Sequence, residues 1–272
     1  MMKDPEYPPP SATAPDTRAD GWQDAIARIG ERRAYAAPYE SLTFPLVTRA
    51  RRELSITLAA QPVFDLARSA PVARRIRRTV RHCGGERALL GLGRRTLEVA
   101  DLKRIDLQTL RNGLDLLRLD ANDSGVIPAF WRTVASSGGR FALLCAEMQH
   151  ESAPGTLLVE IMGGLEQASP EDIQATIEHC ETGALGVILH IAPDPDCARR
   201  LAQIRAQCLA IDFAGVEHES ARDWLRAVDL IDAGRRASPR LMLLNLRPDR
   251  GLAAQAAGAT HAVFAGMDAV IA

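Results

Sequence analysis

Short, continuous runs of apolar residues recur through the second half of the chain and are separated by polar segments. The runs lie at Phe141–Ala146, Leu157–Ile161, Val187–Ile191, Leu209–Phe213, Leu241–Leu246 and Ala262–Ala265. Each run is too continuous for a strand with one face in water, and it is typical of a strand covered on both faces. The pattern therefore predicts a series of buried parallel strands.

Helix signals lie between these runs. The shared signal is a capping residue followed by a proline, an acid or both in the first turn, and in two cases a glycine follows the last turn. It predicts helices over Ile173–Cys180, Ala198–Gln207 and Leu252–Ala257, introduced by Ser169-Pro170, Asp194-Pro195 and Asp249-Arg250-Gly251, with Gly183 ending the first and Gly258 the third. Strands and helices therefore alternate.

Several β/α units in succession predict an α/β fold with a parallel sheet, and residues 41–272 suit one closed (β/α) TIM-type barrel domain better than two domains. An open, doubly wound sheet is the alternative. The phosphate-binding motifs that commonly accompany an open, doubly wound sheet are absent, because the sequence contains neither a GxGxxG nor a GxxxxGK[ST] motif.

Residues 1–40 have a different composition. They contain Pro5, Pro8, Pro9, Pro10, Pro15 and Pro38 among small and charged residues. Such a segment cannot bury enough apolar surface to offset the entropy lost on ordering, so it predicts a disordered tail. Within it, Trp22–Ile29 has the pattern of a short amphipathic helix that would dock on the barrel or on a partner.

Composition and charge narrow the function classes. The chain of 272 residues is 47% hydrophobic and 25% charged, with a net charge of −1 and 4% aromatic residues. A near-neutral chain with few aromatics is not typical of a nucleic-acid-binding protein. It has neither a signal peptide nor an apolar run of the roughly 18 residues that cross a bilayer, so we expect a cytoplasmic protein without a membrane partner.

The five cysteines give no sign of cross-linking. Cys83, Cys145, Cys180, Cys197 and Cys208 are odd in number and show no CxxC spacing. Most lie in apolar runs, which indicates reduced thiols in the core. We expect neither a disulfide nor a cysteine zinc site.

Four segments carry a resemblance to a known family. Gln61–Leu66, Leu157–Ile161, Leu209–Asp212 and Gly258–Val263 follow one another with the order and separations of the EAL domain. The chain from about Leu42 to its C-terminus therefore resembles this barrel, the cyclic di-GMP phosphodiesterase. The resemblance implies a role in bacterial signalling. It also implies a candidate site at the C-terminal ends of the strands.

Active members of the family bind two divalent cations with carboxylates and an asparagine, and they use a nearby lysine. Several of these positions have changed here. The signature Glu-Ala-Leu corresponds to Arg75-Ile76-Arg77, and the asparagine falls near Pro128-Ala129-Phe130. In Glu-Leu-Thr-Glu, Glu160 keeps the first acid and Gly163 replaces the second.

Most of the remaining metal-binding and catalytic positions of the family are also replaced in this sequence. The Asp-Asp pair becomes His190-Ile191, and the Lys-Ile-Asp motif keeps only Asp212, with Ala210 in place of the lysine. Glu-Gly-Val-Glu corresponds to Leu243–Leu246, and the late glutamine to Val263. Hard cations require oxygen ligands, so the sequence predicts no metal site and no catalytic residue.

Four residues at the former mouth positions are the candidate ligand-binding residues: Glu160, Arg75, His190 and Asp212. We predict an ion pair between Arg75 and Glu160, because a partly buried carboxylate needs a counter-charge. Asp212 has a simpler interpretation as the cap of the loop that follows its strand. His190 is the one histidine with a positional argument.

Two neighbouring features are also better explained by structural roles than by ligand binding. Arg74, Arg75, Arg77, Arg78 and Arg81 would alternate between the two faces of a strand rather than form one patch. Gly163-Gly164 fits a tight turn better than a phosphate cradle.

The prediction is thus a catalytically inactive EAL-like domain that acts by binding a protein partner or a second copy of itself, without a cofactor. Metal-independent binding of cyclic di-GMP is an alternative but not the expected outcome. A rival class is an active barrel enzyme that uses Glu160, His190 and Asp212. An apolar plug of Leu243, Leu246 and Val263 in the mouth would exclude that rival, because it leaves no wet pocket.

Overall fold

The structure, a computed structural model, describes residues 41–83, 85, 97–117, 124–136, 156–182, 185–216 and 220–266. The described residues form a nine-stranded sheet whose strands follow one another in chain order. The strands are β1 (Ser41–Val47), β2 (Glu53–Asp65), β3 (Ala70–His82), β4 (Ser124–Phe130), β5 (Thr156–Met162), β6 (Gly186–Ile191), β7 (Cys208–Asp212), β8 (Leu241–Leu246) and β9 (His261–Phe264).

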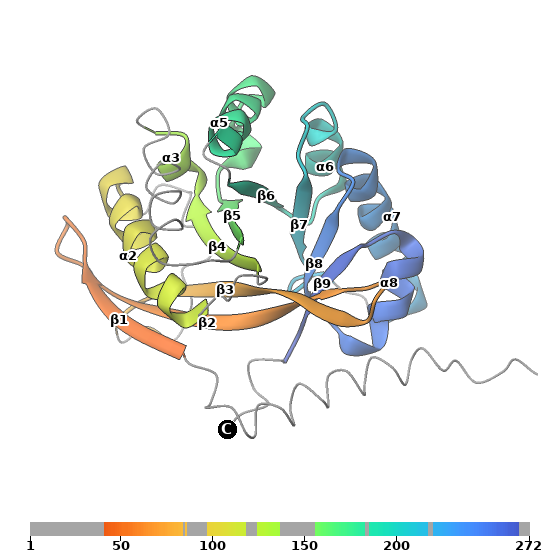
Figure 1. The fold of residues 1–272 in the computed structure, drawn as a ribbon, viewed down its shortest axis with the longest axis horizontal. Coiled ribbons are helices and arrows are strands. Elements are labelled where there is room, and N and C mark those ends of the chain that lie inside the picture. The colour runs from red at the N-terminus through yellow and green to blue at the C-terminus, as the bar shows by residue number, and fades with distance from the viewer. Residues whose placement is uncertain are drawn as a thin grey trace, which may run out of the picture.

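The sheet closes into a barrel because β9 pairs with β2 as well as with β8. Strands β3 to β9 are parallel, whereas β2 runs antiparallel to both of its barrel neighbours. Strand β1 pairs with β2 alone and lies outside the closed ring (Figure 1). The predicted (β/α) barrel is therefore correct, with an inverted first strand and an added outer strand.

Helices surround the ring of strands (Figure 1). They are α2 (Val99–Leu117), α3 (Trp131–Val134), α5 (Pro170–Thr182), α6 (Pro195–Leu201), α7 (Ala221–Ala237) and α8 (Gly251–Ala257), with single turns η1 (Leu165–Gln167) and η2 (Pro248–Arg250). None of the described helices combines the length and the apolar composition needed to cross a bilayer.

The predicted local signals determine where the helices start. The Ser169 hydroxyl accepts a hydrogen bond from the Asp172 amide before α5, and the Asp194 carboxylate accepts one from the Asp196 amide before α6. Helix α8 ends at Gly258, whose φ of 111° is left-handed. The prediction for the second helix was too long, because α6 ends at Leu201 rather than near Gln207.

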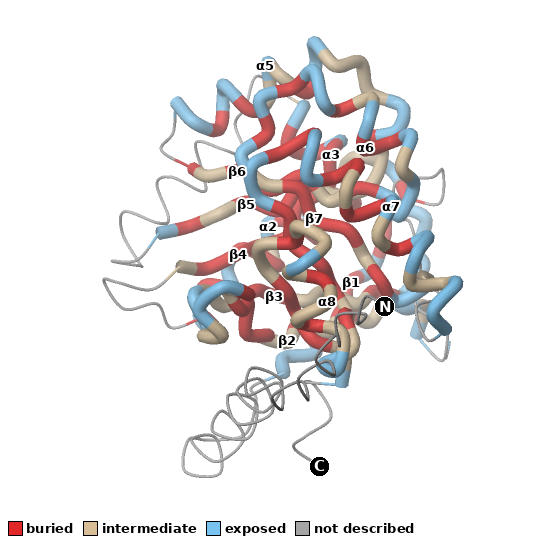
Figure 2. Tube along the Cα trace, turned by 90° about the vertical axis from the view of Figure 1, so that its right-hand side faces the viewer, coloured by how far each residue is buried: buried red, intermediate tan, exposed pale blue. Residues whose placement is uncertain are grey.

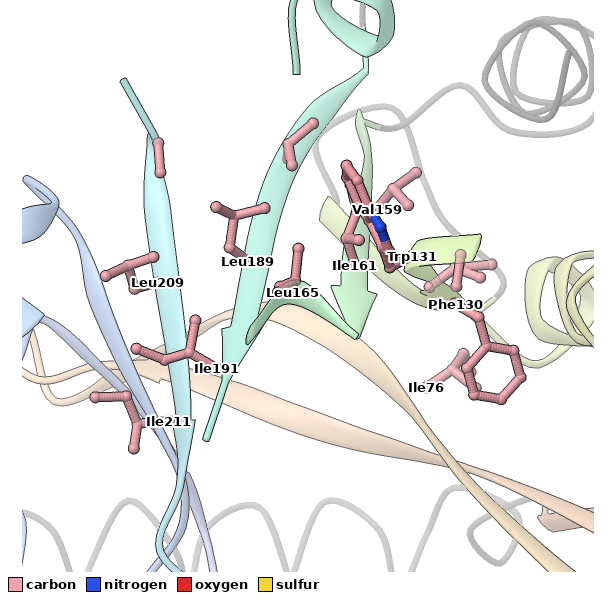
Figure 3. Packing of buried hydrophobic residues seen from close by; sticks show 14 of the residues in the cluster. Ile76, Phe130, Trp131, Val159, Ile161, Leu165, Leu189, Ile191, Leu209 and Ile211 are labelled. Atoms are coloured by element: carbon pink, nitrogen blue, oxygen red, sulfur yellow. The ribbon is translucent and has the colours of Figure 1, made fainter. Parts of the chain in front are cut away.

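Alternate residues of each strand pack on opposite sides. Val159 and Ile161 of β5, with their equivalents on β6 and β7, face the helices and form the main core (Figure 3). The residues between them face the barrel axis, where a second apolar cluster includes Val126, Ile188 and Met242. Buried residues accordingly follow the strands, and exposed residues follow the outer faces of the helices (Figure 2).

Some sequence predictions are not covered. The tail of residues 1–40, the strand expected at Phe141–Ala146 and Cys145 lie outside the described residues. Of the other cysteines, Cys180 and Cys197 are buried free thiols, as expected, and Cys208 is partly buried. Cys83 was wrongly assigned to the core, because it lies exposed just after β3.

Candidate functional site at the mouth of the barrel

The candidate site is a cavity at the end of the barrel where the parallel strands finish. Its volume is about 560 Å³, and residues of β3 to β8 line it. Arg75, Pro128, Met162, His190, Asp212 and Leu244 each contribute from a different strand. All of them face the barrel axis, so the alternation along each strand selects which side chains reach the mouth.

The centre of the site is an ion pair between Arg75 and Glu160. Arg75 Nε donates to Glu160 Oε2 at 2.5 Å and Arg75 Nη2 donates to Oε1 at 2.8 Å, a bidentate arrangement. Glu160 is 0% exposed and Arg75 is 6% exposed. Arg75 Nη1 also donates to Gln61 Oε1 at 3.1 Å. The ion pair predicted from the sequence is therefore present.

His190 completes the environment of Glu160. Its Nδ1 lies 2.7 Å from Glu160 Oε1, and the side chain is 14% exposed at the cavity wall. Burial alone would raise the pKa of Glu160. The Arg75 charge and the hydrogen bonds from His190 and Arg75 instead hold that pKa well below its ordinary value of 4.5. Glu160 is thus an ionised carboxylate that accepts a hydrogen bond from the imidazole Nδ1–H.

Asp212 does not join this group. Its Oδ1 accepts hydrogen bonds from the Ala214 amide at 2.8 Å and from Asn245 Nδ2 at 2.7 Å. The first bond caps the loop after β7, as its position at a strand end predicted. Of the three residues that the rival enzyme hypothesis uses, Glu160 and His190 are in contact, whereas Asp212 is bonded to other residues.

A second buried ion pair lies beside the mouth. Arg78 Nη1 donates to Asp106 Oδ1 at 2.6 Å, and the Phe130 amide donates to Asp106 Oδ2 at 3.1 Å. The Arg78 guanidinium lies over the Phe130 ring, 4.0 Å from its centroid. Burial raises the pKa of Asp106, and Arg78 opposes that shift. This pair connects α2 to the barrel.

The sequence interpretation missed the Arg78–Asp106 pair, although a signal was present. Asp106 lies on the apolar face of α2, in line with Leu102, Ile105 and Leu110, where a carboxylate requires a partner. Two further residues were missed: Gln61, which accepts from Arg75, and Asn245, which donates to Asp212. Amide side chains carry no comparable pattern signal.

The arginines of β3 are divided between the two faces of the strand, as predicted. Arg75, Arg77 and Arg81 share the face that lines the mouth cavity, and Arg78 reaches the cavity from the other face. Burial lowers the pKa of Arg77, and the nearby charges of Arg75 and Arg81 lower it further, whereas Asp212 raises it. Positive charge therefore gathers along one wall of the mouth.

The apolar plug that would have excluded the rival enzyme does not form. Leu243 and Leu246 pack in the core between the sheet and the helices, whereas Leu244 lines the mouth cavity and Val263 belongs to the cluster on the axis. The pairing of β8 with β9 shifts register between Leu243 and Leu246, and Asn245 has a left-handed φ of 55°. This irregularity changes which side chains of β8 face inward.

The mouth does not fit the two cations that active EAL enzymes use. Both oxygens of Glu160 are bonded to Arg75 or His190, so a cation that bound Glu160 would have to displace one of these donors. Gly163 and Gly164 form a turn with φ of 70° and 98° and offer no side-chain oxygen. Within the described ranges, no three His, Cys, Asp or Glu side chains are grouped to hold a metal ion. The described carboxylates at the mouth are therefore not clustered as the oxygen ligands that Mg²⁺ or Ca²⁺ prefers.

The fold has clear relatives among solved structures. The Bacillus subtilis YkuI protein, with an EAL domain and in complex with substrate c-di-GMP and calcium, superposes with a TM-score of 0.56 at 14% identity, over 75% of this chain and 53% of that chain. An EAL domain protein from Listeria monocytogenes gives a TM-score of 0.52 at 11% identity, over 93% of this chain and 92% of that chain.

The S helix-GGDEF-EAL segment of Vibrio cholerae LapD gives a TM-score of 0.57 at 10% identity, over 92% of this chain and 57% of that chain. This chain therefore spans about half of the YkuI and LapD chains. No protein-family model and no curated protein matches the sequence. At these identities the likeness concerns the backbone, so the chain has the fold of an EAL domain.

Proposed function

We propose that this chain is a catalytically inactive EAL-like domain that acts in bacterial signalling by binding a protein partner or a second copy of itself. The fold supports the link to cyclic di-GMP signalling. The residues at the mouth support the loss of hydrolysis, because they have become an internally satisfied polar cluster.

The observation that carries the proposal is the bidentate pair of Arg75 with Glu160. Two-metal hydrolysis needs cations that activate the attacking water and stabilise the leaving oxygen. A cation approaching Glu160 would meet the guanidinium of Arg75 and would have to displace it from a fully buried carboxylate. Displacement would leave the guanidinium without its counter-charge, and such a loss is strongly unfavourable inside a protein.

The test is a calorimetric titration of the whole chain with cyclic di-GMP, in buffer with EDTA and in buffer with Mg²⁺ or Ca²⁺, followed by chromatography of the products. We expect no hydrolysis and no metal-dependent heat. Metal-dependent turnover would overturn the proposal. Light scattering over a range of protein concentrations separates the two partner classes, because a self-associating chain doubles its mass and a chain awaiting another protein does not.

A second candidate function is metal-independent binding of cyclic di-GMP, and one observation favours it. The mouth is an open cavity of about 560 Å³ with Arg77 and Arg81 on one wall and Phe130 nearby. Guanidinium groups suit phosphodiesters, and a pocket of this size is typical of a small-molecule site. Two neighbours are described in complex with this nucleotide, the YkuI protein and a standalone EAL protein from Vibrio cholerae O395.

The same titration distinguishes this candidate. Saturable binding that persists in EDTA, produces no hydrolysis and weakens in Arg77→Gln and Arg81→Gln would favour nucleotide binding over a protein partner. A control variant is Arg222→Gln, which changes an exposed arginine of α7 outside the lining of the cavity.

A further inference from the structure

A second cavity opens at the other end of the barrel, where the parallel strands begin. We call it the base cavity; its volume is about 510 Å³. Three residues of the lining near the starts of their strands, Ala73, Gly186 and Cys208, are small. Barrel interiors are normally filled at this level by layers of bulky side chains, so small residues leave the end of this barrel hollow.

The base cavity is separate from the mouth. Among the described residues, none lines both cavities. The axial cluster that includes Ile188, Ala210, Met242 and Val263 is buried between them. Binding at one end therefore requires no side chain of the other end.

The walls of the base cavity are mainly apolar. Val63, Val126, Leu158, Ile188 and Met242 are among the apolar residues that line it. The small size of Gly186 allows the Leu158 side chain to lie against the backbone of β6, since a Cβ there would overlap the end of Leu158. An apolar lining with a few polar groups at the rim is typical of a small-molecule pocket of a few hundred Å³.

The lining of the base cavity has neutral polar groups in its interior and charged groups at its rim. Burial raises the pKa of the Cys208 thiol to about 12, and burial lowers the pKa of His261, so both are neutral at neutral pH. The rim carries two exposed charged residues, Arg240 and Glu181. After burial, Arg240 has the next largest effect on the pKa of Cys208, which it lowers, and it lowers the pKa of His261 against the larger opposing effect of Asp65. Its positive charge therefore acts on the interior of the cavity.

We propose that the base cavity binds a small amphiphile whose apolar chain occupies the interior and whose single carboxylate pairs with Arg240. The apolar walls select the chain, and the guanidinium at the rim selects the anionic head. Such a ligand would give the domain a binding site on the face opposite the candidate mouth site.

The test uses methionine methyl groups as reporters at the two ends. Met242 lines the base cavity and Met162 lines the mouth. Protein labelled with ¹³C-methyl methionine is titrated with decanoate, decanol and decylamine, and the two signals are assigned from Met242→Leu and Met162→Leu. We expect decanoate to shift the Met242 signal saturably and to leave the Met162 signal unchanged, with decylamine binding most weakly.

Two kinds of variant make the result specific. Arg240→Gln should weaken decanoate binding by about tenfold and leave decanol binding unchanged, because only the carboxylate pairs with the guanidinium. Arg222→Gln, an exposed arginine of α7, should change neither. Cys208→Phe should fill the base cavity and abolish binding of both ligands, and Ala73→Leu is a milder filling variant if Cys208→Phe does not fold.

The proposal is overturned if decanoate below its micelle concentration gives no saturable shift of the Met242 signal. It is also overturned if Arg240→Gln binds decanoate as tightly as the natural chain, or if only the Met162 signal moves. The mouth is tested separately with cyclic di-GMP, so failure of one proposal does not imply failure of the other.

Discussion

Arg75 on β3 and Glu160 on β5 are 85 positions apart in the sequence and form a buried, two-point ion pair with nitrogen–oxygen distances of 2.5 and 2.8 Å. Strand β4 lies between their strands in the sheet, so the two long side chains meet across the barrel interior. The pair satisfies a carboxylate that would otherwise be buried without a counter-charge.

Arg75→Met should destabilise the protein strongly. It leaves Glu160 ionised and buried without its main partner, and such a loss costs about 3–5 kcal/mol of unfolding free energy. Urea unfolding followed by circular dichroism measures it. Arg81→Met, on the exposed end of the same strand, is the control and should change stability by less than about 0.5 kcal/mol.

Combining Arg75→Met with Glu160→Leu should recover part of that loss, because the double variant removes both charges from the interior. A double variant no more stable than Arg75→Met alone would show that the uncompensated charge is not the source of the instability.

Stability should fall on acidification, and Glu160 should account for part of the fall. Its pKa in the folded chain lies below the ordinary value of 4.5, so the unfolded chain takes up this proton first. The stabilisation is complete above the ordinary pKa and is lost as pH falls through the lower, folded pKa. Urea unfolding from about pH 7 to pH 3 should therefore show a steeper decline for the natural chain than for Glu160→Gln.

Asp106 acts in the opposite direction, because burial raises its pKa and its protonation on acidification favours the folded chain. For this reason the difference between the natural chain and Glu160→Gln is the informative quantity. Parallel curves for the two proteins would contradict the prediction.

Divalent cations should not stabilise the folded chain. A ligand that binds only the folded state raises the unfolding midpoint increasingly as its concentration exceeds its dissociation constant, so a few millimolar Ca²⁺ or Mg²⁺ would reveal even weak binding. Because the carboxylate of Glu160 is already paired, we expect midpoints equal to those in EDTA. A midpoint that rises with metal concentration would be incompatible with the donor set at the mouth.

Asn245→Ala should destabilise the protein by about 1–2 kcal/mol, for two reasons. The alanine would keep the left-handed φ of 55° that asparagine tolerates, and the hydrogen bond to Asp212 would be lost. Asn245→Gly removes the same hydrogen bond but relieves the backbone, so it should lose less. Equal losses in denaturant unfolding would show that the backbone contributes nothing.

Gly258→Ala should also destabilise the protein, by about 1–2 kcal/mol. Gly258 ends α8 at a φ of 111°, and an added Cβ would overlap the side chain of Arg235. Gly215→Ala is the matched control, since no atom lies within 4 Å of a Cβ there. Thermal unfolding of the two variants beside the natural chain measures the difference, and a Gly258→Ala protein as stable as Gly215→Ala would contradict it.

The sequence by itself determined the local elements. Predominantly apolar runs specified β5 to β9, because strands covered on both faces carry apolar residues on both faces. Ser169 and Asp194 specified the starts of α5 and α6 because a cap bonds to an amide two or three residues away. The four spaced segments were also enough to indicate the barrel, because their order reflects the order of its strands.

Only the tertiary structure decided how the mouth is built. Strand register brought Arg75 to Glu160 and Arg78 to Asp106, and the irregular pairing of β8 with β9 placed Leu246 on the helix side together with Leu243. The small residues at the other end became a cavity only when the ring of strands closed. Such features depend on the relative positions of strands distant in the chain, and no local preference encodes them.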